Sequence, residues 1–179
     1  EKMSAVLAPA GTINVYRPMN AALRERNVER IRRWWDYIVL LQLALLKLPI
    51  ADVPMVYRGI RDPRPDILIE DLRRDEANAT PDVWWQFTST STSRDAAEEF
   101  LEGGTKQVLR VVDGAGSGAR DIKEYSDFPE EDELLMPCGS AFVIREVKEP
   151  APGVVHVSLV QTEAVLLLQR DAEVRMHRH

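Results

Sequence analysis

The sequence predicts an α+β fold, because helical patterns come first and strands dominate the later half of the chain. Residues 20–48 carry one apolar stripe at steps of three and four, which is typical of one amphipathic helix or of two in succession. After Pro54 the pattern changes to short runs rich in β-branched and aromatic residues, punctuated by proline and glycine. A chain of 179 residues that is 45% apolar is long enough to bury a core of its own.

The first predicted element is the helical segment at residues 20–48. Asn20 is a candidate N-cap, and Pro49 ends the segment. We expect both neighbouring tryptophans to pack in the core with the rest of the stripe. The stripe consists of Ile31, Trp34, Trp35, Ile38, Leu41, Leu45 and Leu48.

The later elements follow in order along the chain. "MVYRGI" (55–60) predicts a strand, "EDLRRDEANA" (70–79) a short helix, and "VWWQFTSTS" (83–91) one strand. "SRDAAEEFLEG" (93–103) predicts a helix with Ser93 as N-cap, closed by Gly103 and Gly104. "KQVLRVVD" (106–113) predicts a strand before the loop "GAGSGA". "ELLMPCGSAFVIREVKE" (133–149) predicts two strands around a turn at "PCGS", and "VVHVSLVQTEA" and "VLLLQR" complete the sheet.

Charge and cysteine usage exclude several classes of function. A net charge of −6 and a pI of about 5.2 argue against a nucleic-acid-binding surface, which is normally basic, but permit one phosphate site built on a single arginine. One cysteine, Cys138, allows no intrachain disulfide, and the histidines lack metal-ligand spacing, so we expect no metal. The most apolar window, residues 37–50, contains Gln42 and Lys47 and is too short to span a membrane.

Three local features could carry chemistry. Arg58 in "VYRGI" is either a surface residue or a guanidinium fork that binds a phosphate, with Gly59 allowing close approach of the backbone to a ligand. The hydroxyls of "FTSTSTS" (87–93) either face solvent or include a buried serine that fixes a carboxylate. The acidic run in "DFPEEDELLMPCGSAFVI" (127–144) is either a solvated turn or a source of catalytic carboxylates.

The acidic run has a pattern that favours the second alternative. Glu131 and Glu133 flank Asp132 directly before an apolar strand, and residues two apart in an extended segment point the same way. Both carboxylates could then enter one cleft. Two carboxylates in one cleft suit chemistry that passes through a cationic, sugar-like transition state.

Taken in order, the arginine, the aromatic-led S-T-S and the E-x-E resemble the R-S-E class of mono-ADP-ribosyltransferases. This arginine-modifying class includes eukaryotic transferases and several bacterial toxins. The resemblance extends over "LALLKLPIADVPMVYRGI", "WWQFTSTSTSRDAAEEF" and "GARDIKEYSDFPEEDELLMPCGSAF", and covers roughly residues 37–144. It implies N-terminal helices packed on two small mixed or antiparallel sheets, with an NAD cleft between them. It also implies a single domain over residues 1–179, with a helical part at 1–48 and a catalytic sheet core at 54–170.

The resemblance implies how NAD would be held. Arg58 matches the arginine that contacts the phosphates of NAD, and Gly59 follows where backbone groups hold the nicotinamide amide. Ser89 matches the serine that orients the catalytic glutamate. Ser91 and Ser93 are alternatives, but the spacing to the following phenylalanine favours Ser89. That residue, Phe100, either stacks on the nicotinamide or is core.

It also implies the roles of the acids. Glu133 matches the catalytic glutamate, which stabilises the positive charge that develops on the ribose when nicotinamide leaves. Glu131 matches the glutamate that marks arginine as the acceptor, and Lys106 is a candidate for a second phosphate-binding cation. The resemblance thus implies NAD and a protein with an accessible arginine as substrates, in the cytoplasm or as a delivered effector. Water as acceptor, in an NAD glycohydrolase, and a non-catalytic binding module are the alternatives.

Overall fold

Two helices open the part of the chain that the computed structural model describes, which comprises residues 15–61, 69–113, 118–125 and 132–162. They are α1 (Tyr16–Glu25) and α2 (Val28–Lys47), and the chain turns between them at Arg26, whose φ is 52°. Asn27 caps α2, because its side chain accepts from the backbone N–H of Arg30 at 3.1 Å. The N-cap predicted at Asn20 was therefore wrong, since Asn20 is a buried residue inside α1.

The apolar stripe of α2 packs on α1 and on the sheet, as predicted. Ile38 and Leu45 are buried, and Trp34 packs against the cluster that also contains Met19 of α1. The prediction of core packing was wrong for Trp35, which is 55% exposed. Consecutive residues lie about 100° apart around a helix, so Trp34 and Trp35 point in different directions. In the part of the chain that the structure describes, no helix is both long enough and apolar enough to cross a bilayer.

Eight strands form one mixed sheet in the order β2-β7-β8-β4-β1-β3-β6-β5. All neighbours are antiparallel except β4 and β8, which are parallel. This sheet, flanked by a few helices, confirms the α+β class. The strands are β1 (Met55–Arg61), β2 (Pro81–Trp84), β3 (Thr88–Ser91), β4 (Gln107–Asp113), β5 (Arg120–Asp121), β6 (Glu133–Met136), β7 (Ser140–Ala151) and β8 (Val154–Gln161).

Two connections carry the chain between two halves of this sheet. Residues 85–87 lead from β2, which pairs with β7, into β3, which pairs with β6. Residues 137–139 lead back from β6 to β7, and Gly139 has a φ of 77° in this turn. The single strand predicted at residues 83–91 is therefore two strands. The halves β2-β7-β8-β4-β1 and β3-β6-β5 correspond to the two small sheets implied by the resemblance, but one residue pair, Tyr57–Ser91, joins them.

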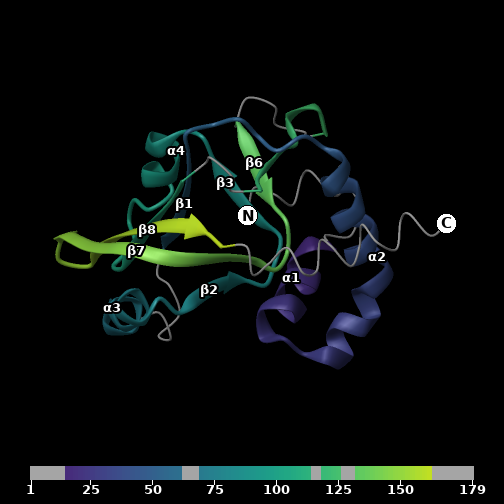
Figure 1. Cartoon of the computed structure of the whole chain (residues 1–179), viewed down its shortest axis with the longest axis horizontal. Coiled ribbons are helices and arrows are strands. Elements are labelled where there is room, and N and C mark those ends of the chain that lie inside the picture. Colours follow the sequence, from purple (N-terminus) through teal and green to yellow (C-terminus); the bar gives the residue numbers. More distant parts are fainter. Residues whose placement is uncertain (1–14, 62–68, 114–117, 126–131, 163–179) are drawn as a thin grey trace.

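The helices flank the two halves on different sides (Figure 1). Helices α1 and α2 lie together beside β3 and β6, where Phe87 and Leu135 complete their shared core. Helix α3 (Ile69–Asn78) lies near β2 and β7, and α4 (Arg94–Glu99) packs on β1. The predicted cap of α4 is confirmed, because Ser93 Oγ accepts from the N–H of Ala96 at 3.2 Å. The segment "VLLLQR" lies outside the described residues.

The thiol of Cys138 is expected to react slowly in the folded protein. It packs against the α1–α2 core and donates to Gln42 Oε1 at 3.4 Å, and burial raises its pKa to about 12. Little thiolate is then present at neutral pH. Iodoacetamide labelling followed by mass spectrometry should show much slower modification in buffer than in denaturant. Equal rates in the two conditions would contradict this burial.

Candidate active site

The candidate site lies where β1 and β3 separate. The two strands share the pair Tyr57–Ser91, and Ser91 is also paired with Glu133 on β6. Both strands are described along their whole length, and they make no further ladder pair beyond this row. Arg58 spans the opening, because its Nη1 donates to the carbonyl oxygen of Ser89 at 2.7 Å. The arginine, serine and glutamate segments therefore meet at one opening between the halves of the sheet.

The register distinguishes the three candidate serines. Ser93 is occupied as the cap of α4, and Ser91 Oγ accepts from the backbone N–H of Ser93 at 3.0 Å. Ser91 lies directly opposite Glu133, whereas Ser89 lies opposite Leu135, one pair along on the same face. Diagonal neighbours of this kind are about 7–8 Å apart, which a long side chain can bridge. Both Ser89 and Ser91 therefore remain placed to orient Glu133.

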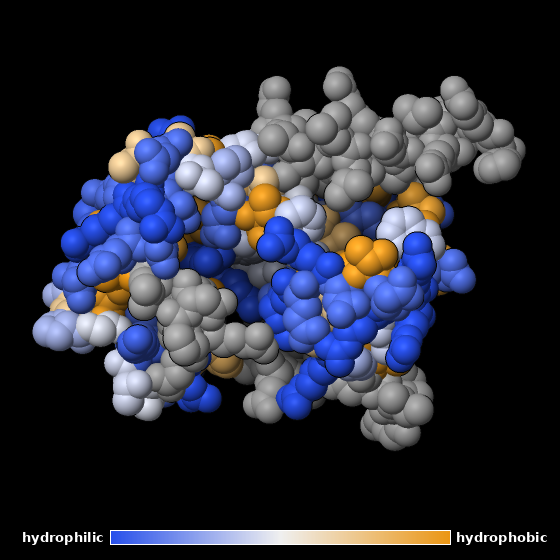
Figure 2. Space-filling view, turned by 90° about the horizontal axis from the view of Figure 1, so that it is seen from below, coloured by the Kyte–Doolittle hydropathy of each residue, from blue (hydrophilic) through white to orange (hydrophobic). Residues whose placement is uncertain are grey.

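Helix α1 supplies a wall that the sequence pattern did not reveal. The Tyr16 hydroxyl donates to the carbonyl oxygen of Phe87 at 3.1 Å, and Asn20 both donates to that oxygen (3.0 Å) and accepts from the Phe87 N–H (3.2 Å). Tyr16 and Asn20 are four residues apart and share one helix face, and this spacing was the available signal. From below, the surface is hollowed between the side carrying α3 and the side carrying α1 and α2, and the hollow is largely hydrophilic (Figure 2).

Three ionisable side chains of the site influence one another electrostatically. Burial lowers the pKa of Arg58, and the neighbouring Tyr16 and Glu133 act in the opposite direction. Burial also raises the pKa of Tyr16 to about 12. The charge of Arg58 opposes this rise, and the charge of Glu133 adds to it. Glu133 is itself only 6% exposed. A poorly hydrated guanidinium next to a buried carboxylate favours a ligand that brings both an anion and a developing cation.

The raised pKa of Tyr16 gives a pH-dependent prediction. Because its pKa is about 12 in the folded protein and 10.0 in the unfolded chain, Tyr16 stabilises the fold fully below pH 10 and loses this effect as the pH rises to 12. Tyr16→Phe should be less stable than wild type at neutral pH because it loses the hydrogen bond to the Phe87 carbonyl oxygen. Ionisation of the buried Tyr16 disfavours the folded wild type, so this difference in stability should narrow by about 1–2 kcal/mol between about pH 9 and about pH 11. Urea unfolding across this range measures the gap, and a constant gap would contradict the shift.

Gly59 and Phe100 are placed by the contact between β1 and α4. A Cβ on Gly59 would overlap the carbonyl oxygen of Ala97 and come within 3.2 Å of the Leu101 side chain, so α4 rests directly on the strand at this glycine. Phe100 follows at the end of α4 and is 41% exposed, which argues against its alternative as a core residue. The guanidinium carbon of Arg61 lies 5.5 Å from the centre of the Phe100 ring.

The two predicted acids of the E-x-E motif stand differently. Glu133 is the first residue of β6 and pairs with Ser91 of β3, whereas Glu131 lies outside the described residues. The extended geometry assumed for this segment was wrong at Asp132, whose φ of 46° is left-handed. Asp132 forms an exposed ion pair with Lys123 at 3.0 Å.

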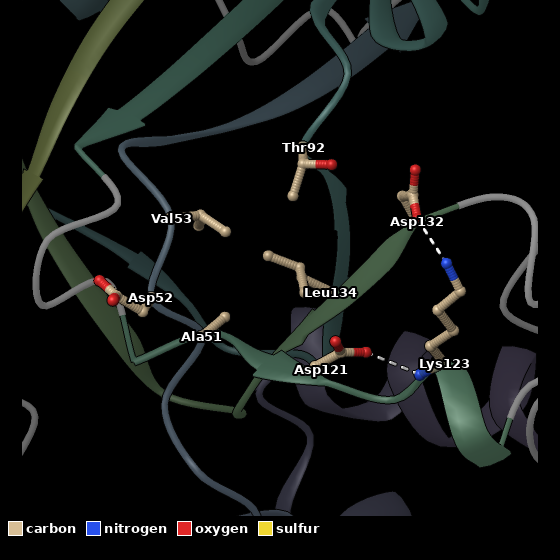
Figure 3. Close-up of a pocket in the computed structure, with 8 residues that line it drawn as sticks. All are labelled: Ala51, Asp52, Val53, Thr92, Asp121, Lys123, Asp132 and Leu134. Carbon is tan, nitrogen blue, oxygen red and sulfur yellow. Dashed lines mark hydrogen bonds and ion pairs between the residues drawn. The ribbon is translucent and has the colours of Figure 1, made fainter.

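A separate pocket of about 200 Å³ is lined in part by Leu134 of β6 (Figure 3). Because side chains alternate along a strand, Leu134 and Glu133 lie on opposite faces of β6. Three carboxylates and one lysine line the pocket, and the lysine bonds to Asp132. The lining consists of Ala51, Asp52, Val53, Thr92, Asp121, Lys123, Asp132 and Leu134. Among the residues that the structure describes, no group of three or more His, Cys, Asp or Glu side chains could hold a metal ion.

Comparison with known proteins assigns the chain to a family. The model of the family described as NAD:arginine ADP-ribosyltransferase matches residues 1–164. The chain belongs to this ADP-ribosyltransferase family.

One curated relative of this ADP-ribosyltransferase chain agrees with the assignment, and two solved structures share its fold. Mav of Mycobacterium avium (strain 104), named as an NAD(+)–arginine ADP-ribosyltransferase, is 31% identical over 147 residues, which cover 82% of this chain and 16% of Mav. The fold resembles that of the ADP-ribosyltransferase Vis from Vibrio splendidus, solved with agmatine, with a TM-score of 0.62, 23% identity and coverage of 83% of this chain and 69% of Vis. It also resembles the toxin Plx2a from Paenibacillus larvae, with a TM-score of 0.64, 18% identity and coverage of 90% and 85%.

The chain thus spans about a sixth of the length of its curated relative, so it corresponds to one part of a longer protein there. In this ADP-ribosyltransferase chain, the described parts of the three segments that carry the resemblance come together in space. Arg58 on β1, Ser89 and Ser91 on β3, and Glu133 on β6 all border the opening between the two halves of the sheet.

Proposed function

We propose that this domain transfers ADP-ribose from NAD to an arginine side chain of a target protein and releases nicotinamide. The observation that supports this most strongly is the Arg58–Ser89 bond beside Glu133, because a half-buried cation and a buried carboxylate then border one opening. The diphosphate of NAD can bind to the guanidinium of Arg58. The ribose, which becomes positively charged in the reaction, can interact with the carboxylate of Glu133. The proposal extends to the whole of residues 1–179 as one catalytic domain.

NAD binding would use the unpaired edge of β1. Arg58 keeps further N–H donors on its guanidinium fork beyond the one that bonds to Ser89, and these suit phosphate oxygens. Among the described residues, β1 has no strand partner on its β3 side beyond Tyr57, so backbone groups near Gly59 are available to the nicotinamide amide. Phe100, exposed at the end of α4, offers a ring face for stacking.

The reaction breaks the bond between ribose C1′ and the nicotinamide ring nitrogen. The bonding electrons go to the ring nitrogen, which becomes neutral, and positive charge develops on the ribose. Glu133, hydrogen-bonded to the ribose 2′-hydroxyl, stabilises this charge, and Ser89 or Ser91 orients its carboxylate. A guanidinium nitrogen of the acceptor then attacks C1′, and Glu131 accepts the proton that this nitrogen loses.

The site of action and the acceptor follow from the same reasoning. Vis and Plx2a are both named as toxins, and we propose a delivered or cytoplasmic effector domain that acts on a protein rather than on nucleic acid. Agmatine, the guanidine bound in a solved structure of Vis, is a suitable small acceptor for a test.

The acceptor is tested by measuring nicotinamide release from NAD with and without agmatine. We expect agmatine to accelerate release in the wild type. Glu131→Gln should lose this acceleration, because the carboxylate that binds and deprotonates the guanidine is gone, while slow hydrolysis by water continues. Release that is unaffected by agmatine in the wild type would instead favour the NAD glycohydrolase, and no release at all would favour a binding module.

A further inference from the structure

The end of α1 and the first half of α2 form a basic region in an acidic protein. Residues 17–36 contain six arginines and three carboxylates, whereas the whole chain has a net charge of −6. Two of these carboxylates are matched by arginines of the same region, because Glu25 pairs with Arg30 and Glu29 pairs with Arg32. The remaining arginines leave the region positively charged at neutral pH.

The outward side of α2 also exposes large apolar side chains. A row spaced by four, three and four residues runs along the helix and consists of Val28, Arg32, Trp35 and Val39. Val28 and Trp35 are 60% and 55% exposed, and the other two side chains are exposed as well. None of the four belongs to the cluster that packs between α1, α2 and the sheet, and α2 forms one side of the molecule (Figure 1). This row therefore combines aromatic and aliphatic groups with positive charge at the surface.

A second exposed tryptophan lies beside the turn between α1 and α2. Trp85, in the connection from β2 to β3, is 42% exposed, and the guanidinium carbon of Arg26 lies 5.9 Å from the centre of its ring. Arg24 donates to the side-chain oxygen of the next residue, Gln86. Both arginines contact neutral groups, so these contacts do not cancel their charges. We call the exposed side chains of the turn and of α2 the basic face, which consists of Arg26, Val28, Arg32, Arg33, Trp35 and Val39.

The composition of the basic face fits the surface of an anionic bilayer. Helices that lie in a membrane interface carry arginines together with tryptophan and aliphatic side chains, and the indole ring favours the headgroup region. The core of a protein–protein interface is instead depleted of charged residues, which lie at its rim. Arg32 stands within the apolar row, between Val28 and Trp35, and this favours lipid over an acidic protein as the partner.

We propose that the basic face docks this domain on a membrane surface rich in anionic phospholipid, without crossing the bilayer. The arginines bind the lipid phosphates, and Val28 and Trp35 enter the interface between the headgroups. The inference does not depend on the proposed function, because it concerns the outer face of α2 and not the cleft. Helix α1 joins the two, since its Tyr16 contacts the Phe87 backbone at the cleft wall. Docking would then favour acceptor proteins at the same membrane.

The proposal is tested by co-sedimentation of the purified chain with vesicles of phosphatidylcholine, alone or mixed with phosphatidylserine. We expect binding to the mixed vesicles only, and weaker binding at higher ionic strength. Arg32→Gln/Arg33→Gln should weaken the binding about 10- to 30-fold, because two charges no longer approach the anionic surface. Trp35→Ser should weaken it about 3- to 10-fold and reduce the blue shift of tryptophan emission that the vesicles cause.

The matched control is Arg73→Gln/Arg74→Gln. These arginines are also exposed neighbours on a helix, and their helix, α3, lies on the other side of the molecule from α2 (Figure 1). The control changes the net charge of the protein by the same amount, so it should bind the mixed vesicles as the wild type does. Urea unfolding of each variant measures whether its fold is retained.

Four results would overturn the inference. They are no binding of the wild type to the mixed vesicles, equal binding to neutral vesicles, wild-type binding by Arg32→Gln/Arg33→Gln, and an equal loss of binding in the α3 control. Binding to polyglutamate but not to vesicles would also overturn it, and would identify the basic face as a protein-binding surface. Cleavage of NAD is measured without vesicles, so the proposed function and this inference fail independently.

Discussion

Glu133→Gln is expected to lower kcat for nicotinamide release by about 10²- to 10³-fold, with little change in the Kd for NAD. The amide has the shape of the carboxylate and preserves the pairing of β6 with β3, but it lacks the negative charge that stabilises the ribosyl cation. Because Glu133 is only 6% exposed, its charge acts where water screens it little. The loss should therefore appear in the chemical step rather than in binding.

Initial rates of nicotinamide release, measured by chromatography at saturating NAD, check this expectation. Glu124→Gln removes the same charge from an exposed position in the short helical turn at Lys123–Tyr125 and should retain nearly full activity. Hydrolysis and transfer to agmatine should fall together in Glu133→Gln, because both follow the same bond cleavage. Wild-type activity in this variant would refute the role given to Glu133.

Gly59→Ala is expected to lower the free energy of unfolding by about 1–3 kcal/mol and to raise the KM for NAD. The added methyl group overlaps a backbone oxygen of α4, which cannot rotate away, so the helix must move off the strand. Phe100 ends that helix and would move with it. Urea unfolding measures the first effect and initial rates at varied NAD the second.

A second variant distinguishes whether Gly59→Ala destabilises the fold through the backbone of α4 or through the side chain of Leu101. Leu101→Ala removes the leucine atoms near Gly59 but leaves the Ala97 carbonyl in place. The loss of unfolding free energy in the double variant should therefore be about the sum of the losses in the two single variants. Recovery of stability in the double variant would show that the leucine side chain, and not the backbone approach, makes glycine necessary.

Local patterns predicted most of the elements but not how they cross between the two halves of the sheet. The cap at Ser93, the strand at Arg58 and the turn at residues 137–139 each depend on residues close in sequence, and each is confirmed. The strand expected over residues 83–91 is broken, because β2 and β3 pair with β7 and β6, partners from distant parts of the chain. Trp35 was misplaced because the stripe did not distinguish the two neighbouring tryptophans.

The candidate site was likewise predicted from local patterns only in part. The order of Arg58, Ser89 and Glu133 along the chain was enough to name them, through the resemblance that it carries. Their arrangement depends on strand register, which places Ser91 directly opposite Glu133, and on α1, which brings Tyr16 near both charges. Tyr16 and Asn20 were not predicted, because their partner, the Phe87 backbone, is identifiable only once the helix is docked on β3.

The central claim is that this cleft joins ADP-ribose from NAD to a guanidine. The most direct measurement is mass spectrometry of the products formed from NAD and agmatine by the wild type and by Glu133→Gln. We predict ADP-ribosyl-agmatine, modified on its guanidine group, together with free nicotinamide from the wild type, and both products at an initial rate about 10²- to 10³-fold lower from the variant. Free ADP-ribose as the sole ribosyl product of the wild type, or a guanidine adduct formed equally well by Glu133→Gln, would contradict the account.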